Sequence, residues 1–155
     1  MKEDVRRRAR ELGFDECRFT SADAPGSAPQ FQRWLEEGKH GAMAYLERNA
    51  RKRVDPQQVL SGARTIVVLA ASYADTEQPG PPSAGFGVIA RYARFADYHD
   101  VLAGRLKQLA SFIDQRGGPE TRSLWYLDTG PLLERDFAQR AGLGFVGKHT
   151  NLISR

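Results

Sequence analysis

The stretch WYLDTGPLLERDFAQRAGLGFVGKHT, residues 125–150, joins an apolar run, a Gly-Pro pair, an amphipathic segment and a glycine-rich turn. This order predicts a strand that ends near Asp128, a helix whose first residue is Pro131, and a turn after Gly142. Gly130 would then cap the helix, and Asp128 would lie two residues before the cap. Sheet proteins place ligands where strand ends meet helix N-termini, so Asp128 is a candidate catalytic acid. A structural turn or ion pair is the competing interpretation.

The rest of the chain alternates between helical and strand-like patterns. Residues 63–73, ARTIVVLAASY, are apolar on both faces and predict a central strand covered on both sides. Further strands are expected at 16–22, 87–94 and 122–128. Helices are expected at 2–12, 27–37, 40–49, 55–60, 97–116 and 131–142, and a Pro/Gly-rich loop at 75–87. The order predicts an α/β (α+β) fold, a mixed sheet flanked by helices.

The composition is that of a globular domain of 155 residues. No apolar run approaches the roughly 20 residues of a membrane helix, and residues 1–12 are charged from the start. We therefore expect a cytoplasmic protein without a membrane partner. Cys17 is the single cysteine, which excludes an internal disulfide, and no spacing of histidines and carboxylates indicates a metal site. The net charge of +4 is compatible with an anionic partner and equally with a solvated surface.

Two further segments contain residues suited to binding. In RYARFADYHD, residues 91–100, arginines alternate with aromatic rings, which suits a large, flat, anionic ligand. Asp97 is suited to cap a helix, and His99 is either a proton carrier or an ordinary surface histidine. GLGFVGKHT, residues 142–150, lacks the spacing of a phosphate-binding loop and follows a helix instead of a strand. It predicts a helix cap and a tight turn whose glycines permit close approach of a ligand.

Three segments together resemble epoxyqueuosine reductase. They are HGAMAYLERNARKRVDPQQVLSGARTIVVLAASY, IARYARFADYHDVLAGRLKQLA and LDTGPLLERDFAQRAGLGFVGKHTNLIS. The combination of RYAR…DYH, DT-x-P-x-LER and AGLG-x-x-GK is far more specific than any one of these motifs. The resemblance runs from about Gly38 to Arg155. It implies a cobalamin-dependent iron–sulfur enzyme that reduces the epoxide of epoxyqueuosine in tRNA to queuosine, with a nitroreductase-like cobalamin-binding domain.

The resemblance also implies roles for individual residues. Asp128 matches the acid of the DT-x-P motif, which implies that it donates a proton as the epoxide opens. Proton donation there lowers the barrier because negative charge builds on the oxygen. The tRNA phosphates are expected to meet basic residues outside the pocket. The expected cobalamin-binding residues are Arg53, Arg91, Tyr92, Tyr98, His99, Gly147, Lys148, Thr150 and Leu152.

The sequence departs from the family pattern at three points. Gly130 stands where the motif usually has alanine, and His149 replaces the asparagine that usually follows Gly-Lys. Two 4Fe–4S clusters need about eight cysteine ligands, whereas this chain has only Cys17. The clusters are therefore expected only in a C-terminal domain that is missing here. Residues 1–155 are expected to form a single, C-terminally truncated cobalamin-binding domain, monomeric and with an unknown electron donor.

Two other functions stay open at this stage. The first is a cobalamin carrier or tRNA-binding module without activity of its own, which the lone cysteine favours for the isolated chain. The second is a flavin reductase of nitroreductase type, because the expected fold is shared with that class.

Overall fold

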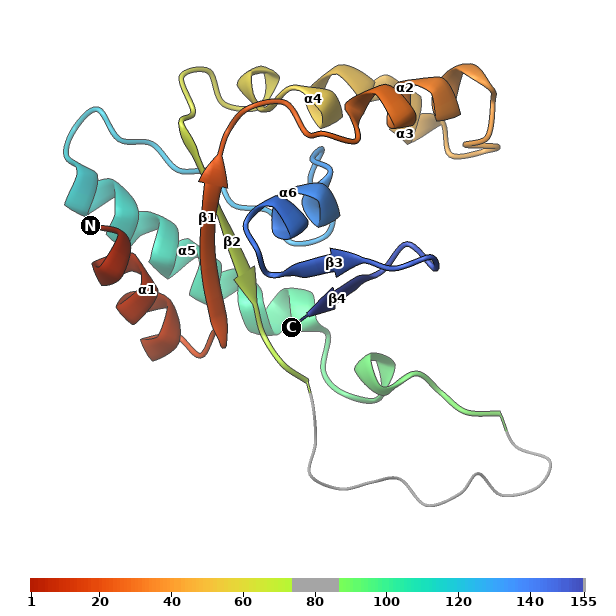
Figure 1. The fold of residues 1–155 in the computed structure, drawn as a ribbon. Helices are drawn as coiled ribbons and strands as arrows, with labels where there is room; N and C mark the ends of the chain where they lie inside the picture. Colours follow the sequence, from red (N-terminus) through yellow and green to blue (C-terminus); the bar gives the residue numbers. More distant parts are fainter. Residues whose placement is uncertain (74–86, 155) are drawn as a thin grey trace. The chain divides into compact units, whose positions relative to one another are not determined.

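The computed structural model describes residues 1–73 and 87–154 of the chain (Figure 1). The chain divides into two compact units, each assembled from segments distant in sequence. The first comprises Met1–Asp15 and Ala70–Leu127, and the second comprises Glu16–Leu69 and Asp128–Arg155. Within the described residues, no helix has the length and apolar character needed to cross a membrane.

The first unit is centred on a pair of helices. The amino-terminal helix α1 (Lys2–Glu11) packs against the long helix α5 (Tyr98–Gly117). Asp97 caps α5 by accepting a hydrogen bond from the backbone N–H of His99, as the sequence predicts. Gly118 ends the helix with φ of 87°, a left-handed conformation that glycine adopts at little cost. The apolar residues buried in these two helices are Val5, Ala9, Leu106 and Leu109.

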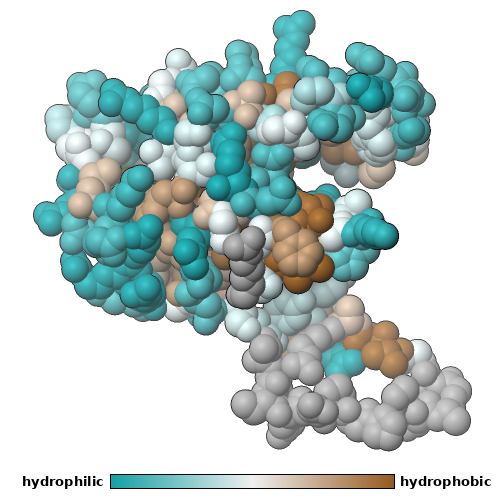
Figure 2. All heavy atoms as spheres, viewed as in Figure 1, coloured by the Kyte–Doolittle hydropathy of each residue, from teal (hydrophilic) through white to brown (hydrophobic). Residues whose placement is uncertain are grey.

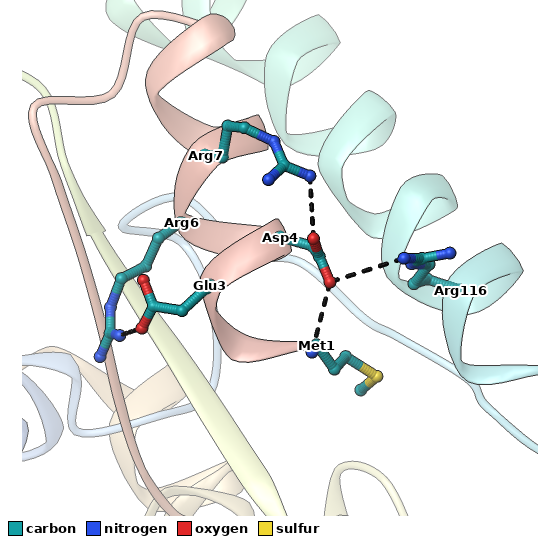
Figure 3. Close-up of polar contacts among 6 residues, drawn as sticks. All are labelled: Met1, Glu3, Asp4, Arg6, Arg7 and Arg116. Carbon is teal, nitrogen blue, oxygen red and sulfur yellow. Dashed lines mark hydrogen bonds and ion pairs between the residues drawn. The ribbon is translucent and has the colours of Figure 1, made fainter.

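Asp4 connects the two helices of the first unit electrostatically. Its carboxylate pairs with the amino terminus of Met1 at 3.3 Å, with Arg7 at 2.8 Å and with Arg116 of α5 at 3.7 Å (Figure 3). Hydrogen bonds from the amino terminus and from Arg7 lower the pKa of Asp4. Because the group is open to solvent, these pairs orient the helices more than they stabilise them.

The second unit contains two small antiparallel sheets. In the first sheet, β1 (Glu16–Ser21) lies beside β2 (Thr65–Ala70) and runs in the opposite direction (Figure 1). In the second sheet, β3 (Gly144–Val146) pairs with β4 (Leu152–Ser154), with Phe145 opposite Ile153. The backbone hydrogen bonds that bracket the β1–β2 pair join Asp15 to Ala70 and Ala22 to Arg64.

Short helices connect β1 to β2 in the second unit. Asp55 caps the last of them by accepting the backbone N–H of Gln57, and Pro56 follows at the first helical position. Ser27 does occupy the N-cap position of its helix, but its side chain makes no capping hydrogen bond. The elements are α2 (Ala28–Glu36), α3 (Ala44–Arg48), α4 (Ala50–Val54) and the 3₁₀ turn η1 (Pro56–Gln58).

Two of the predicted strands, at 87–94 and 122–128, are wrong, although the mixed α/β content is confirmed. Residues 91–94 form the 3₁₀ turn η2 (Arg91–Arg94), and residues 121–127 have no regular structure. The predicted central strand is β2, but its only neighbour among the described residues is β1, and most of its side chains are half-buried. The expected single mixed sheet is thus replaced by two-stranded sheets. A strand requires a hydrogen-bonding neighbour, which a local apolar pattern does not specify.

The helix α6 (Glu134–Arg140) is tied to the connection between β1 and α2 by two of its side chains. The carboxylate of Asp136 accepts the backbone N–H groups of Gly26 at 3.2 Å and Ser27 at 2.8 Å. The guanidinium of Arg140 also lies 4.9 Å from the centroid of the Phe137 ring. Arg140 donates to the carbonyl oxygens of Ser21, Asp23 and Ala24 and to the hydroxyl of Thr20.

Replacing Arg140 should destabilise the second unit. Arg140→Ala leaves several carbonyl groups without their charged donor, and we expect a loss of about 2 kcal/mol in the free energy of unfolding. Arg140→Lys should recover only part of this loss, since an ammonium lacks the planar fork of donors. Urea denaturation measures the change, with the exposed Arg48→Ala as the matched control. Equal stability of the Arg140 and Arg48 variants would contradict the anchoring role.

Candidate functional site

The candidate site is built on the loop of residues 128–133, which leads into α6. The prediction that the helix starts at Pro131 is wrong, because α6 begins at Glu134 with Leu133 in the N-cap position. Leu133 has ψ of 71°, which lies outside the helical region, so the helix cannot begin before it. Gly130 is therefore no helix cap. Asp128 belongs to an irregular loop instead of a tight strand-to-helix junction.

Asp128 has an unusual backbone conformation. Its φ is 60°, in the left-handed region that residues other than glycine rarely adopt. This conformation costs roughly 1–2 kcal/mol for a residue with a Cβ atom. The loop that begins at Asp128 leads into α6, whose first residue is Glu134.

Asp128 lines an open pocket of the second unit together with residues of α3 and α4. The pocket has a volume of about 470 Å³. Arg53 contributes a positive charge to it, and one nitrogen of its guanidinium lies 3.5 Å from the carbonyl oxygen of Leu132 in the loop. The structure therefore brings together two residues that the sequence singled out separately, Asp128 and Arg53. The lining residues are Tyr45, Asn49, Arg53, Asp128, Thr129 and Pro131.

Glu134 is the charged group near the pocket that the sequence analysis did not single out. Desolvation by the surrounding protein raises its pKa, and the negative charge of Asp128 adds to this effect. The hydrogen bond from Asp128 and the charge of Arg53 act in the opposite direction. The side chain nevertheless keeps exposed surface, so solvent screens part of this coupling. In the sequence, Glu134 could have been noticed as the acid of the LER motif that follows DT-x-P.

The β3–β4 hairpin contains four of the expected cofactor-binding residues, three in its turn and Leu152 in β4. Gly147 and Thr150 close the turn with a backbone hydrogen bond of 2.9 Å, and Thr150 has φ of 66°. Arg135 of α6 donates to the carbonyl and hydroxyl oxygens of Thr150, which ties the turn to the helix that follows the Asp128 loop. Lys148 is exposed, and Leu152 pairs with Val146 across the hairpin.

Apolar side chains gather over this hairpin, as Figure 2 shows. Phe145 and Ile153 are directly opposite each other and both are exposed, at 48% and 39%. The hairpin thus presents an apolar surface beside a polar turn.

The other expected cofactor-binding residues belong to the first unit, and their roles stay predictions. The side chain of Arg91 lies outside the described residues, and Tyr92 is exposed in η2. The rings of Tyr98 and His99 stack with centroids 4.2 Å apart. His99 is joined to Asp97 through Nδ1 at 2.8 Å, and its backbone and side-chain hydrogen bonds lower the pKa of Asp97. His99 therefore takes part in the cap of α5.

The sequence comparisons identify relatives of one kind. A family model described as epoxyqueuosine reductase QueG, DUF1730, matches residues 53–129, a segment that includes Arg53 and Asp128. The epoxyqueuosine reductase of Leadbetterella byssophila is 38% identical over 153 residues, which cover 98% of this chain and 49% of the relative. The epoxyqueuosine reductase of Gloeobacter violaceus is 41% identical over 152 residues, which cover 97% of this chain and 46% of the relative. The chain spans less than half the length of these curated relatives.

Solved structures agree with the sequences. The Streptococcus thermophilus epoxyqueuosine reductase superimposes with a TM-score of 0.83 at 30% identity, over 99% of this chain and 42% of that one. An epoxyqueuosine reductase solved with an epoxyqueuosine-modified tRNA-Tyr stem loop gives a TM-score of 0.80 at 31% identity. The match covers 99% of this chain and 41% of that one. The Bacillus subtilis enzyme, solved with its catalytic aspartate loop swung out of the active site, gives a TM-score of 0.75 at 30% identity. The match covers 99% of this chain and 41% of that one. The chain therefore belongs to the epoxyqueuosine reductase family and corresponds to the amino-terminal region of its members.

Proposed function

We propose that this chain is the part of an epoxyqueuosine reductase that binds cobalamin and supplies the catalytic acid. The reaction converts the epoxide of epoxyqueuosine in tRNA to the alkene of queuosine, and Asp128 is the proton donor. The observation that carries the proposal is the position of Asp128. Its backbone is held in a left-handed conformation at a pocket that also contains Arg53. Buried or constrained acids of this kind are typical of functional sites.

The chemistry explains why an acid is needed. Removal of the epoxide oxygen breaks two C–O bonds and consumes two electrons and two protons, and the products are an alkene and water. Negative charge develops on the oxygen as the ring opens. A carboxyl that donates a proton at that point accelerates such steps by about 10²–10⁴-fold. Asp128 supplies the proton in this scheme, and Arg53 adds positive charge to the same pocket.

A loop position for the acid agrees with the family. The Bacillus subtilis relative has been solved with its catalytic aspartate loop swung out of the active site. Asp128 also lies in a loop, and the irregular backbone of residues 128–133 separates it from the rigid helix α6. A hinged acid can admit a bulky substrate and then approach the oxygen.

The donor set of the pocket suits part of a cobalamin. The hydroxyl of Tyr45, the amide of Asn49 and the guanidinium of Arg53 are suited to the carboxamide and phosphate groups of that cofactor. The pocket is smaller than a corrin with its side chains, so these residues would hold one edge. In the same unit, the β3–β4 hairpin contributes the proposed contacts Gly147, Lys148, Thr150 and Leu152. In the first unit, the candidate cofactor-binding residues are Arg91, Tyr92, Tyr98 and His99. When bound, cobalamin would supply the electrons delivered to the epoxide carbon.

Iron–sulfur clusters do not fit the residues present. Cys17 is the only cysteine in the sequence, and it is buried in β1. One thiolate cannot hold a cluster, so no step of the proposed reaction in this chain runs through one.

Replacing the acid tests the mechanism. In the full-length enzyme, Asp128→Asn should lower the turnover of epoxyqueuosine-tRNA at least about 100-fold, because the amide cannot donate an acidic proton. Cobalamin binding should be unchanged, since the amide keeps the size of the side chain. Asp23→Asn, at an exposed position of the same unit, is the matched control. Turnover close to that of the wild type would remove Asp128 from the acid role.

Cobalamin binding can be measured on this chain directly. Titration should change the absorption bands of the corrin, and the cofactor should co-elute with the protein on gel filtration. Arg53→Ala should weaken the affinity about tenfold, the loss expected for one charge-assisted hydrogen bond. Arg51→Ala, exposed on the same helix, should have little effect. The absence of both a spectral change and co-elution would contradict the proposal.

The second candidate function is a binding module without chemistry of its own. It is favoured by the single cysteine, by the net charge of +4, and by the relative solved with a tRNA stem loop. It predicts that tRNA binding weakens steeply as salt rises, because phosphate contacts release counterions. Filter binding at several salt concentrations measures the slope. An affinity that does not depend on ionic strength would exclude this function.

A further inference from the structure

The turn of residues 147–150, between β3 and β4, contains a residue that the proposed function leaves unexplained. His149 occupies the position at which the family pattern usually has asparagine. Its Nδ1 atom lies 3.3 Å from the backbone nitrogen of Asn151, two residues further along the chain. An asparagine side chain commonly accepts a hydrogen bond from the backbone N–H two residues on and so stabilises a turn. The imidazole of His149 therefore makes the bond that an asparagine is suited to make there.

We propose that His149 is a positioning residue of this turn and closes it as a neutral imidazole. A backbone N–H group only donates, so Nδ1 must carry the acceptor lone pair and the ring proton must be on Nε2. An amide oxygen accepts at every ordinary pH, whereas a protonated imidazole has no acceptor left. Histidine in place of asparagine thus makes closure of the turn depend on pH. The proposal deepens the proposed function and rests on it only where cobalamin binding is concerned.

The packing of the ring against the turn supports this role. A Cβ atom at Gly147 would lie 2.7 Å from Cε1 and 3.0 Å from Nδ1 of His149, so the ring lies directly against the backbone of Gly147. The N–H of Gly147 donates to the carbonyl oxygen of Asn151 at 2.9 Å. The bond to His149 uses the other backbone group of Asn151, its N–H. The ring therefore contacts the turn both at its first residue and at its exit.

A second support of the turn does not depend on pH. Thr150 has a left-handed φ of 66°, which a residue other than glycine keeps only when its surroundings hold it. Arg135 of α6 donates to its carbonyl oxygen and, at 3.1 Å, to its hydroxyl oxygen. A guanidinium stays charged over the whole working range of pH. Protonation of His149 should therefore release the Asn151 side of the turn while Arg135 still holds Thr150.

The charges around the turn act in the same direction as the loss of the acceptor. They belong to the turn itself and to α6, which packs against β3 and β4. The charged residues of these elements are Lys148, Glu134, Arg135, Asp136 and Arg140. A proton on His149 adds a positive charge next to Lys148 in the chain, and like charges repel. Histidine side chains as a class change charge between about pH 5 and 8, so a titration over that range tests the closure.

Nuclear magnetic resonance on this chain tests the closure without cofactor or activity. The nitrogen shifts of the neutral His149 ring should show the proton on Nε2. The amide signal of Asn151 should follow the titration of that ring with the same midpoint, and His149→Asn should abolish the step while the hairpin is kept. His40→Asn, the same change at the other histidine of this unit, should leave the step intact. A neutral ring protonated on Nδ1, or an Asn151 amide that is blind to His149, would overturn the proposal.

The affinity of this chain for cobalamin tests the consequence. At about pH 8, where histidine is neutral, His149→Ala should weaken binding about fivefold, the factor that corresponds to one neutral hydrogen bond. His149→Asn keeps an acceptor and should bind as tightly as the wild type. At about pH 5 the wild type should bind more weakly than His149→Asn by a similar factor, because only the imidazole has lost its acceptor. Equal affinities of the three proteins at both pH values would overturn the positioning role.

The two proposals fail in distinguishable ways. If the Asn151 amide follows His149 but cobalamin does not bind, the proposed function is wrong and the closure of the turn by His149 stands. If cobalamin binds but the amide ignores His149, the proposed function stands and the role of His149 is wrong.

Discussion

The contacts of Asp136 and Arg140 with the end of β1 and the residues that follow it are the constraint on which the second unit depends. They join groups that are 109 to 120 residues apart in sequence. Closing so long a loop costs conformational entropy, and the chain offsets it with charge-assisted bonds to several backbone groups at once. Because both side chains are on α6, the same contacts fix the helix and hence the end of the loop that contains Asp128.

That arrangement explains how a short loop can support a strained residue. Residues 128–133 lead directly into α6, and Arg53 donates to the carbonyl oxygen of Leu132 near that end of the loop, at 3.5 Å. These contacts restrict the loop from the side of α6, whereas Asp128, with its left-handed backbone, lies at the other end of the loop. Catalytic groups benefit from this kind of support because a side chain placed in advance loses little entropy when the substrate binds.

The features that could be predicted from the sequence are those decided by neighbouring residues. The cap of α5 by Asp97, the turn at Asp55-Pro56 and the glycine that ends α5 all follow from local backbone chemistry. The strands predicted at 87–94 and 122–128 fail because pairing depends on partners far away in the chain. The helix start predicted at Pro131 is wrong for a different reason. Proline suits a loop as well as a first helical turn, and Leu133 adopts a non-helical ψ after it.

The distribution of chemical groups separates proton supply from electron supply in the proposed reaction. The described residues place a carboxyl, a guanidinium and a second, coupled carboxyl around one loop. The sequence offers a single thiol, in a strand and buried. A proton donor acts over hydrogen-bond distances and must sit on the loop that approaches the oxygen. Electrons, in contrast, can reach a corrin from ligands elsewhere, so nothing in the geometry of residues 128–134 has to change to accommodate their source. The position of the acid loop then depends mainly on the contact of Arg53 with Leu132 and on the anchor of α6 through Asp136.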